Sequence, residues 1–171
     1  MATKIILFRG LPGVGKSFIS DETAKILKIA IIRKDDIYNC IHSEITVDEN
    51  RNKICYKIIY KIIETNLLSD TDLIIDCPFK DIEELKRLSS FVQERNGELK
   101  SILCNCSDPN LWEERFNERL VNPQPTQLTT DFKEVKNTYE KSEPEKFDDE
   151  LVVDTKISLD ENILHIINYI T

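Results

Sequence analysis

The chain has 171 residues, of which 40% are hydrophobic and 32% charged, and its formal net charge at pH 7 is −8. This length predicts one globular domain over residues 1–171. The acidic charge argues against a general nucleic-acid coat, because neutralising phosphates needs a basic surface. No apolar run approaches the roughly 20 residues of a membrane span, and the N-terminus lacks a signal-peptide pattern. We therefore expect a cytoplasmic protein without a membrane partner.

Taken in chain order, short β-branched apolar runs alternate with segments of helical periodicity. The apolar runs predict five buried strands, over residues 4–8, 29–33, 72–76, 99–106 and 151–154. The periodic segments predict helices over residues 17–27, 48–68, 82–94, 107–120, 132–141 and 161–170. In the longest helix, the spacing predicts that the core-facing residues are Ile54, Ile58, Ile62 and Ile63.

This alternation predicts a parallel sheet that is covered by helices on both faces. With right-handed crossovers, the fold class is α/β, a doubly wound three-layer α/β/α sandwich with a five-stranded parallel sheet. Residues 122–149 are polar and acidic and contain three prolines, so we interpret them as a surface excursion. Together with the preceding helix they predict a small helical lid at about residues 109–142.

The cysteines and histidines lack the spacing of a zinc site. The cysteine number is odd, and the closest pair forms C-x-C within a predicted strand. The residues are Cys40, Cys55, Cys77, Cys104, Cys106, His42 and His165. We interpret the cysteines as buried reduced thiols.

The segment Gly10-x-x-x-x-Gly15-Lys16-Ser17 lies between the first predicted strand and the first helix and matches the P-loop pattern G-x-x-x-x-G-K-[ST]. Its glycines allow backbone N–H groups to converge on a phosphate, and the helix N-terminus adds its positive dipole end. We predict that Lys16 reaches the β- and γ-phosphates and that Ser17 binds Mg²⁺. The predicted nucleotide-binding residues here are Gly10, Leu11, Pro12, Gly13, Val14, Gly15, Lys16, Ser17 and Phe18.

Motifs of other P-loop classes are missing from the sequence. The third strand ends at Asp76 in Asp-Cys-Pro-Phe, without the D-x-x-G of a GTPase, and no N-K-x-D follows a later strand. No glutamate follows Asp76 to polarise water, as in a motor ATPase. A phosphotransferase instead excludes water and places an acceptor hydroxyl beside a carboxylate. These absences favour a phosphotransferase.

Two strand ends carry carboxylates at the sheet edge where ligands bind in α/β proteins. Asp35 and Asp36 follow the second strand, and either could deprotonate an acceptor hydroxyl; the alternative is that they cap a helix over residues 37–41. Asp76 ends the third strand and could hold Mg²⁺. Its alternative is to buttress the P-loop lysine.

Arg115 and Arg119 lie four residues apart and therefore on one helical face. Two guanidiniums next to a lid suit the γ-phosphate and its transition-state charge; the alternative is a solvated ladder with Glu114 and Glu118. After the last strand, Asp154 and Thr155 are candidates for a loop that borders the base.

A basic stripe follows one face of the longest helix, at Lys53, Lys57 and Lys61. We interpret it as a solvated helix face. The alternative is a basic wall for a phosphorylated or polynucleotide acceptor.

The motifs GLPGVGKS, RKDD, LIIDCPF, ERFNER and VVDT together resemble the small P-loop kinases often labelled AAA-family ATP-binding domains. Polynucleotide 5′-hydroxyl kinases, chloramphenicol phosphotransferase and zeta-toxin-like kinases are similar. The resemblance covers nearly the whole chain. It implies a P-loop NTPase fold, ATP with Mg²⁺, and transfer of the γ-phosphoryl to a hydroxyl. It also implies that Asp35 is the base and that Arg115 and Arg119 form the lid pair.

The sequence therefore predicts an ATP-dependent phosphotransferase that acts on a hydroxyl of a small-molecule or unidentified acceptor. Polynucleotide kinases tend to carry an arginine shortly after the aspartate pair, where this chain has Tyr38. A polynucleotide 5′-hydroxyl kinase is thus the second alternative, with nucleic acid a less favoured partner. The third is an ATP-binding or slowly hydrolysing switch. The sequence does not separate ATP from GTP as donor.

Overall fold

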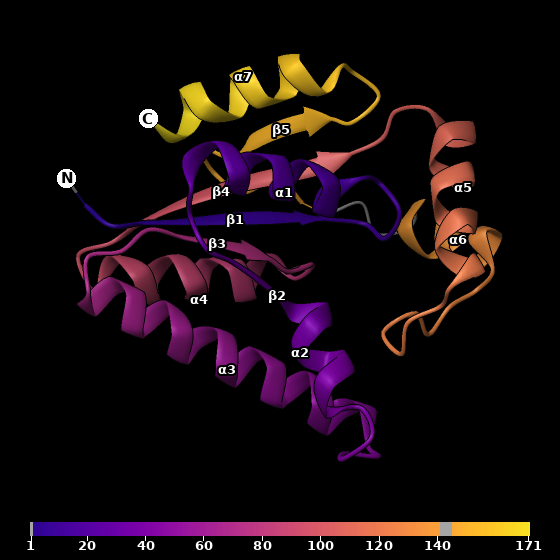
Figure 1. The fold of residues 1–171 in the computed structure, drawn as a ribbon, viewed down its shortest axis with the longest axis horizontal. Helices are drawn as coiled ribbons and strands as arrows, with labels where there is room; N and C mark the ends of the chain where they lie inside the picture. The colour runs from indigo at the N-terminus through magenta and orange to yellow at the C-terminus, as the bar shows by residue number, and fades with distance from the viewer. Residues whose placement is uncertain (1, 141–144) are drawn as a thin grey trace.

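The computed structural model describes residues 2–140 and 145–171 and contains a five-stranded sheet in which every pairing is parallel (Figure 1). The strand order is β2-β3-β1-β4-β5. The strands are β1 (Lys4–Gly10), β2 (Ile31–Arg33), β3 (Leu73–Asp76), β4 (Glu98–Asn105) and β5 (Leu151–Asp154). The predicted five-stranded parallel sheet is confirmed.

Helices cover both faces of the sheet, and a further group lies beyond the carboxyl ends of the strands (Figure 1). Helices α1 (Lys16–Leu27) and α7 (Leu159–Ile170) pack on one face, and α3 (Asp48–Leu68) and α4 (Ile82–Gln93) pack on the other. The remaining elements are α2 (Lys34–Ile41), α5 (Pro109–Glu118), the 3₁₀ helix η1 (Arg119–Val121) and α6 (Phe132–Glu140). This is the predicted three-layer α/β/α sandwich.

The two faces of β1 divide the core into two clusters. Ile6 and Phe8 pack in the cluster that contains α1 and α7, whereas Ile5 and Leu7 pack in the cluster that contains α3 and α4. All four side chains are fully buried. A strand that is apolar on both faces is typical of the centre of a parallel sheet, and it places the residues after Gly10 in the middle of the functional edge.

The inward face of α3 differs from the prediction. Cys55, Ile59, Ile63 and Leu67 are buried, together with Arg51 at the start of the same row. Ile54, Ile58 and Ile62 are only partly buried on the flanks of this row, so of the four predicted residues only Ile63 was correct. Isoleucines occupy several phases of this helix, and local periodicity alone could not choose between them.

Element boundaries shift by a few residues. β2 begins at Ile31 and not at residue 29, and α2 follows it directly, so Asp35 and Asp36 lie within the first turn of a helix. The helix predicted from residue 107 begins at Pro109, capped by Asp108, and α7 begins two residues early, capped by Ser158. Lys141, the predicted end of α6, and the last residues of the predicted lid lie outside the described residues.

The cysteines are free thiols, as expected, although Cys40 is exposed and Cys106 partly so. Burial raises the pKa of Cys77 and of Cys104 to about 12, so these two thiols stay protonated at neutral pH. Within residues 2–140 and 145–171, no three His, Cys, Asp or Glu side chains gather as a metal-binding group.

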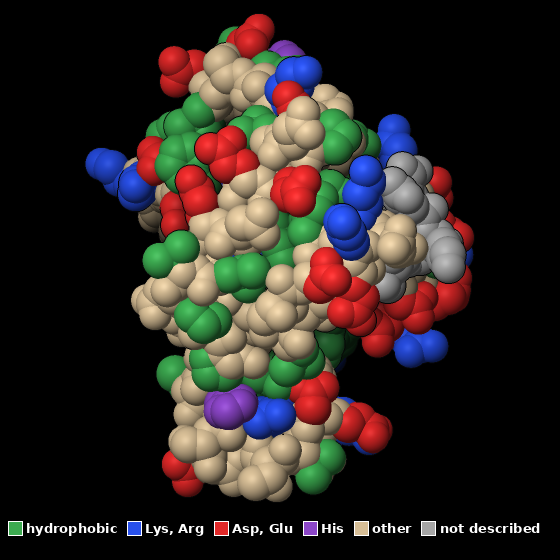
Figure 2. Space-filling view, turned by 90° about the vertical axis from the view of Figure 1, so that its right-hand side faces the viewer, with side chains coloured by type: hydrophobic (Ala, Val, Ile, Leu, Met, Phe, Trp, Pro, Cys, Tyr) green, Lys and Arg blue, Asp and Glu red, His purple; other side chains and the backbone are tan. Residues whose placement is uncertain are grey.

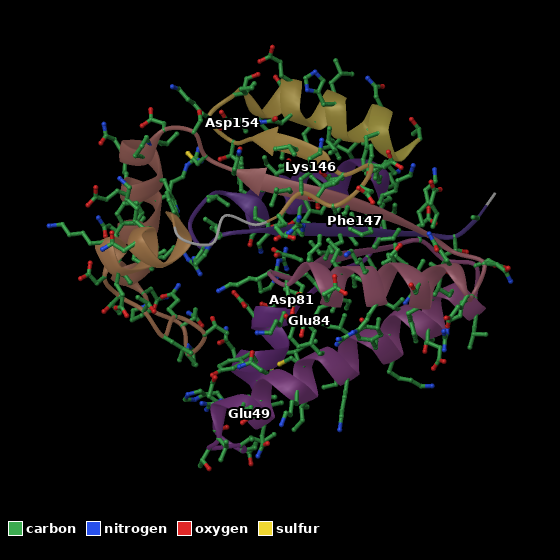
Figure 3. The ribbon with its side chains drawn as sticks, turned by 180° about the vertical axis from the view of Figure 1, so that it is seen from behind. Glu49, Asp81, Glu84, Lys146, Phe147 and Asp154 are labelled. Atoms are coloured by element: carbon green, nitrogen blue, oxygen red, sulfur yellow. The ribbon has the colours of Figure 1, made fainter. Side chains whose placement is uncertain are left out.

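A buried ion pair ties β1 to the segment that leads back into β5. The Arg9 guanidinium donates to both carboxylate oxygens of Glu150 at 2.6 Å, and Arg9 is fully buried. Glu150 also accepts from the Ser101 hydroxyl at 2.5 Å and from the backbone N–H of Phe147 at 3.1 Å. Phe147, labelled in Figure 3, packs against the α3–α4 side of the core. One carboxylate therefore joins β1, β4 and the return segment.

Replacing Glu150 by alanine is expected to lower the free energy of unfolding by about 3–5 kcal/mol, because it leaves the Arg9 charge buried and unpaired. Urea denaturation followed by circular dichroism measures the change. The matched control is Lys53→Gln, which removes an exposed pair with Glu49 and should change stability by no more than about 0.5 kcal/mol. Equal effects of the two substitutions would show that the Arg9–Glu150 pair has no special structural role.

Candidate active site

The glycine-rich loop begins where β1 meets β4. Gly10 has φ 145°, and a Cβ there would lie 2.3 Å from the carbonyl oxygen of Cys104, which excludes any side chain. Gly15, with φ 94°, caps α1 without a side-chain hydrogen bond, and the first turn of α1 holds no acidic residue. The N–H groups at the start of α1 are therefore available to an anion such as a phosphate.

Lys16 and Asp76 meet at the carboxyl end of the sheet. The Lys16 ammonium forms an ion pair with Oδ1 of Asp76, whose side chain is 3% exposed. Oδ2 of Asp76 is buried and has no hydrogen-bond partner among the described residues. A buried carboxylate oxygen without a partner fits a water molecule or a cation ligand. Ser17 and Asp76, the two predicted magnesium ligands, line the same pocket of about 240 Å³.

A cleft of about 1080 Å³ opens at this edge of the sheet. Its walls are built from the carboxyl edge of the sheet and the elements around it. They are the glycine loop, the first turn of α2, the start of α3, the loop after β3, the end of α5, η1, residues 126–129, α6, the loop after β5 and the start of α7. Of the predicted site residues, those that line it are Gly10, Leu11, Pro12, Gly13, Gly15, Lys16, Ser17, Phe18, Asp35, Arg115, Arg119 and Thr155. The structure thus brings most of the predicted residues together.

The two aspartates at the start of α2 differ in position. Asp35 lines both the cleft and the adjoining small pocket, whereas Asp36 lines only the small pocket. The Asp36 side chain is 67% exposed and lies 3.5 Å from a guanidinium nitrogen of Arg33. Asp35 is therefore the better placed of the two to meet a molecule in the cleft.

The two arginines of α5 and η1 also occupy different places. Arg115 donates to the hydroxyl of Thr155 at 2.9 Å, to the Thr155 carbonyl at 3.3 Å and to the Val14 carbonyl at 3.5 Å. Arg119 lines the cleft and also the small pocket that contains Ser17 and Asp76. Arg115 thus joins the glycine loop to the loop after β5, and Arg119 lies on the side of Ser17 and Asp76.

Helix α5 is attached to the glycine loop. The indole N–H of Trp112 donates to the Pro12 carbonyl at 2.8 Å, and a Cβ on Gly13 would lie 3.2 Å from the backbone of Phe116. Residues 126–129, beyond α5, line the cleft, and the Thr126 N–H donates to the Asn39 side chain of α2 at 3.3 Å. Within the predicted lid, residues of α5, η1 and α6 also line the cleft, and the segment after η1 is the part that reaches α2.

The two predicted residues after β5 behave differently. Thr155 donates its hydroxyl to the Val14 carbonyl and lines the cleft. Asp154, labelled in Figure 3, instead accepts from the N–H groups of Ser107 and Lys156 at 3.1 and 3.0 Å. Burial opposes ionisation of this carboxyl, but these hydrogen bonds and the Lys156 charge outweigh it and lower its pKa. Asp154 thus holds loops in place.

Sequence reasoning missed most of the wall opposite the glycine loop. Lys34, Asp48, Asn52 and Lys80 line the cleft there, beside Tyr38. The signal was local: Lys34 precedes the aspartate pair at the strand end, and Asp48 and Asn52 lie four residues apart at the start of a helix. The basic stripe, by contrast, lies outside the cleft, where Lys53 pairs with Glu49 and Lys61 with Glu64.

These features define a P-loop protein: a glycine loop between the central strand and α1, with Lys16 beside a strand-end aspartate on a parallel sheet. The family model for the AAA domain matches residues 5–141, and the chain belongs to that family. No curated protein matches the chain. None of the described helices has the length and apolar character needed to span a membrane.

Several solved structures with this fold are small kinases. A proposed kinase from Chloroflexus aurantiacus is 15% identical, with a TM-score of 0.79 over 99% of both chains. A gluconokinase from Sinorhizobium meliloti is 15% identical, with a TM-score of 0.66 over 98% of this chain and 90% of that one. APS kinase from Mycobacterium tuberculosis is 14% identical, with a TM-score of 0.68 over 99% and 98%. The chain thus has the fold of small P-loop kinases.

The Thr155 hydroxyl contacts both the glycine loop, at Val14, and Arg115. We expect Thr155→Val to lower the free energy of unfolding by about 1–2 kcal/mol, because Val14 and Arg115 each lose a buried partner. Nucleotide affinity should fall several-fold, since the loop is less well ordered. Urea denaturation and calorimetric titration with ATP measure the two effects. Thr130→Val, at an exposed position, should change neither; comparable effects there would mean that the Thr155 contacts are unimportant.

Proposed function

We propose that this protein transfers the γ-phosphoryl group of ATP to a hydroxyl of a small acceptor. The observation that carries the proposal is that one cleft contains the glycine loop on one wall and the Asp35 carboxylate on another. A phosphate donor and a hydroxyl acceptor could thus meet between them. The gluconokinase and the APS kinase, whose structure holds AMPPNP and APS, have the same fold and support this class of reaction.

The donor half of the reaction would use the glycine loop, Lys16 and Arg119. Backbone N–H groups of the loop would bind the phosphates. Lys16 would break or keep only part of its ion pair with Asp76 in order to reach the β- and γ-phosphates. Ser17 and Asp76 would hold Mg²⁺, which when bound neutralises charge on the phosphate oxygens. Arg119 would stabilise negative charge on the phosphoryl group in the transition state of transfer.

The acceptor half would use Asp35 as general base. Asp35 takes the proton of the acceptor hydroxyl while the oxygen of that hydroxyl forms a bond to the γ-phosphorus. The bond from that phosphorus to the bridging oxygen breaks, and ADP leaves with the electron pair. The segment over residues 126–129, which reaches α2 through Thr126 and Asn39, would exclude water from the cleft. We place the moving part of the lid there, after α5.

The polynucleotide alternative gains no support from the charges. Lys53, Lys57 and Lys61 are exposed on α3 and do not line the cleft. On the face around α5 and α6, Figure 2 shows basic and acidic side chains interspersed, without a continuous basic patch among the described residues. A polynucleotide strand would need such a patch. The switch alternative does not explain a polar acceptor wall that faces the glycine loop.

Asp35→Asn is expected to lower acceptor-dependent ADP formation by about 10²–10⁴-fold, because the acceptor loses its general base. ATP affinity should stay near that of the wild type. Coupled ADP release over a panel of hydroxyl compounds, with mass spectrometry of the phosphorylated product, measures transfer.

Asp36→Asn is the matched control for this experiment, since Asp36 is its exposed neighbour, and it should retain transfer. Lys16→Ala should lose nucleotide binding and transfer together. The assignment of the base would be contradicted if Asp35→Asn kept full transfer, or if Asp36→Asn lost transfer while Asp35→Asn did not.

A further inference from the structure

Lys34 is a buried cation in the acceptor wall. It is the first residue of α2, it is only 9% exposed, and it lines the cleft. Its ammonium donates to the side-chain oxygen of Asn52 at 2.6 Å and lies 5.6 and 5.7 Å from the ring centroids of Tyr38 and Tyr56. Positive charge is disfavoured at a helix N-terminus, so stabilising α2 does not explain this lysine.

The carboxylate nearest to this network is already occupied. Asp48 accepts from the Tyr38 hydroxyl, from the Asn52 amide at 3.0 Å, and lies 3.9 Å from the guanidinium of Arg51. No carboxylate of the described residues forms an ion pair with Lys34. The connected network of Lys34, Asn52, Asp48, Tyr38 and Arg51 therefore holds two cations against one carboxylate.

This excess charge has a physical cost. A buried ammonium without a counter-charge is unfavourable, and an amide oxygen and two aromatic faces offset that only in part. Asp35 lines the same cleft, but within the described residues it forms no ion pair with Lys34. When water leaves the closed cleft, the Lys34 charge becomes more costly still. A ligand that brings a negative charge to this wall would remove the imbalance.

We propose that the phosphoryl acceptor carries an anionic oxygen group, a carboxylate, phosphate or sulfate, and that Lys34 binds it with help from Asn52. The proposal rests on the proposed function in one respect, which is that the acceptor hydroxyl lies at Asp35. Lys34 and Asp35 are consecutive residues that line one cleft, so one small molecule could reach both.

The test compares matched pairs of hydroxyl compounds that differ in an anionic group: glucose and gluconate, and glycerol and glycerol 3-phosphate. Binding is measured by calorimetry on protein saturated with Mg²⁺ and ADP, so that the glycine loop is already filled. We expect the wild type to bind an anionic member at least tenfold more tightly than its neutral partner. Lys34→Met, which keeps an unbranched apolar stem but removes the charge, should abolish this preference.

Two further variants complete the design. Lys34→Arg keeps the charge and should keep most of the preference, which shows that the preference depends on a positive charge at this position. Lys53→Gln removes an exposed lysine of α3 and should leave the preference unchanged. Equal binding of anionic and neutral members by the wild type overturns the proposal, as does a preference that survives in Lys34→Met.

The binding experiment is separable from the proposed reaction. Asp35→Asn should bind the anionic members at least as well as the wild type although it no longer transfers phosphate. If Asp35→Asn transfers at the full rate while the Lys34-dependent preference persists, the base assignment fails and the anionic subsite stands. If transfer depends on Asp35 but anionic and neutral acceptors react equally well, the base assignment stands and the anionic subsite fails.

Discussion

The backbone of β1 approaches that of β4 so closely at Gly10 that a Cβ there would lie 2.3 Å from the Cys104 carbonyl oxygen. This contact fixes where the central strand ends and where the glycine loop turns away from the sheet. Because β1 pairs with both β3 and β4, the loop emerges in the middle of the carboxyl edge. Asp76 therefore lies at the end of the neighbouring strand β3, opposite Phe8 of β1, where Lys16 reaches it.

The two halves of the cleft rest on supports of different strength. The glycine loop is held by the central strand, by Trp112 and Arg115 of α5, and by Thr155 after β5. The acceptor wall is built on β2, a three-residue strand at the edge of the sheet, and on the short helix α2 that follows it. If the proposed reaction holds, a well-anchored donor side beside a less anchored acceptor side suits a fold that keeps its phosphate donor and varies its acceptor.

Much of this arrangement follows from the sequence. The glycine loop could be predicted because phosphate binding demands particular residues at fixed spacing, and the sheet because buried parallel strands are apolar on both faces. Asp35 and Asp76 could be placed at one edge because parallel strands end together. The inward row of α3 could not be predicted, since isoleucines occupy several helical phases. The bond from Arg115 to Thr155 joins segments 40 residues apart, which no local pattern encodes.

The acceptor wall escaped prediction for a related reason. Lys34 has meaning only beside Asn52 and the two tyrosine rings, and those residues come from later turns of α2 and from α3. In the sequence, a lysine before two aspartates suggests a neutralised surface cluster. In the fold, Asp36 lies next to Arg33, and Asp48 interacts with Tyr38, Asn52 and Arg51. Lys34 instead contacts the Asn52 amide oxygen and two aromatic rings. The charge balance of this wall is thus set by tertiary contacts, and we base the proposed anionic acceptor on that balance.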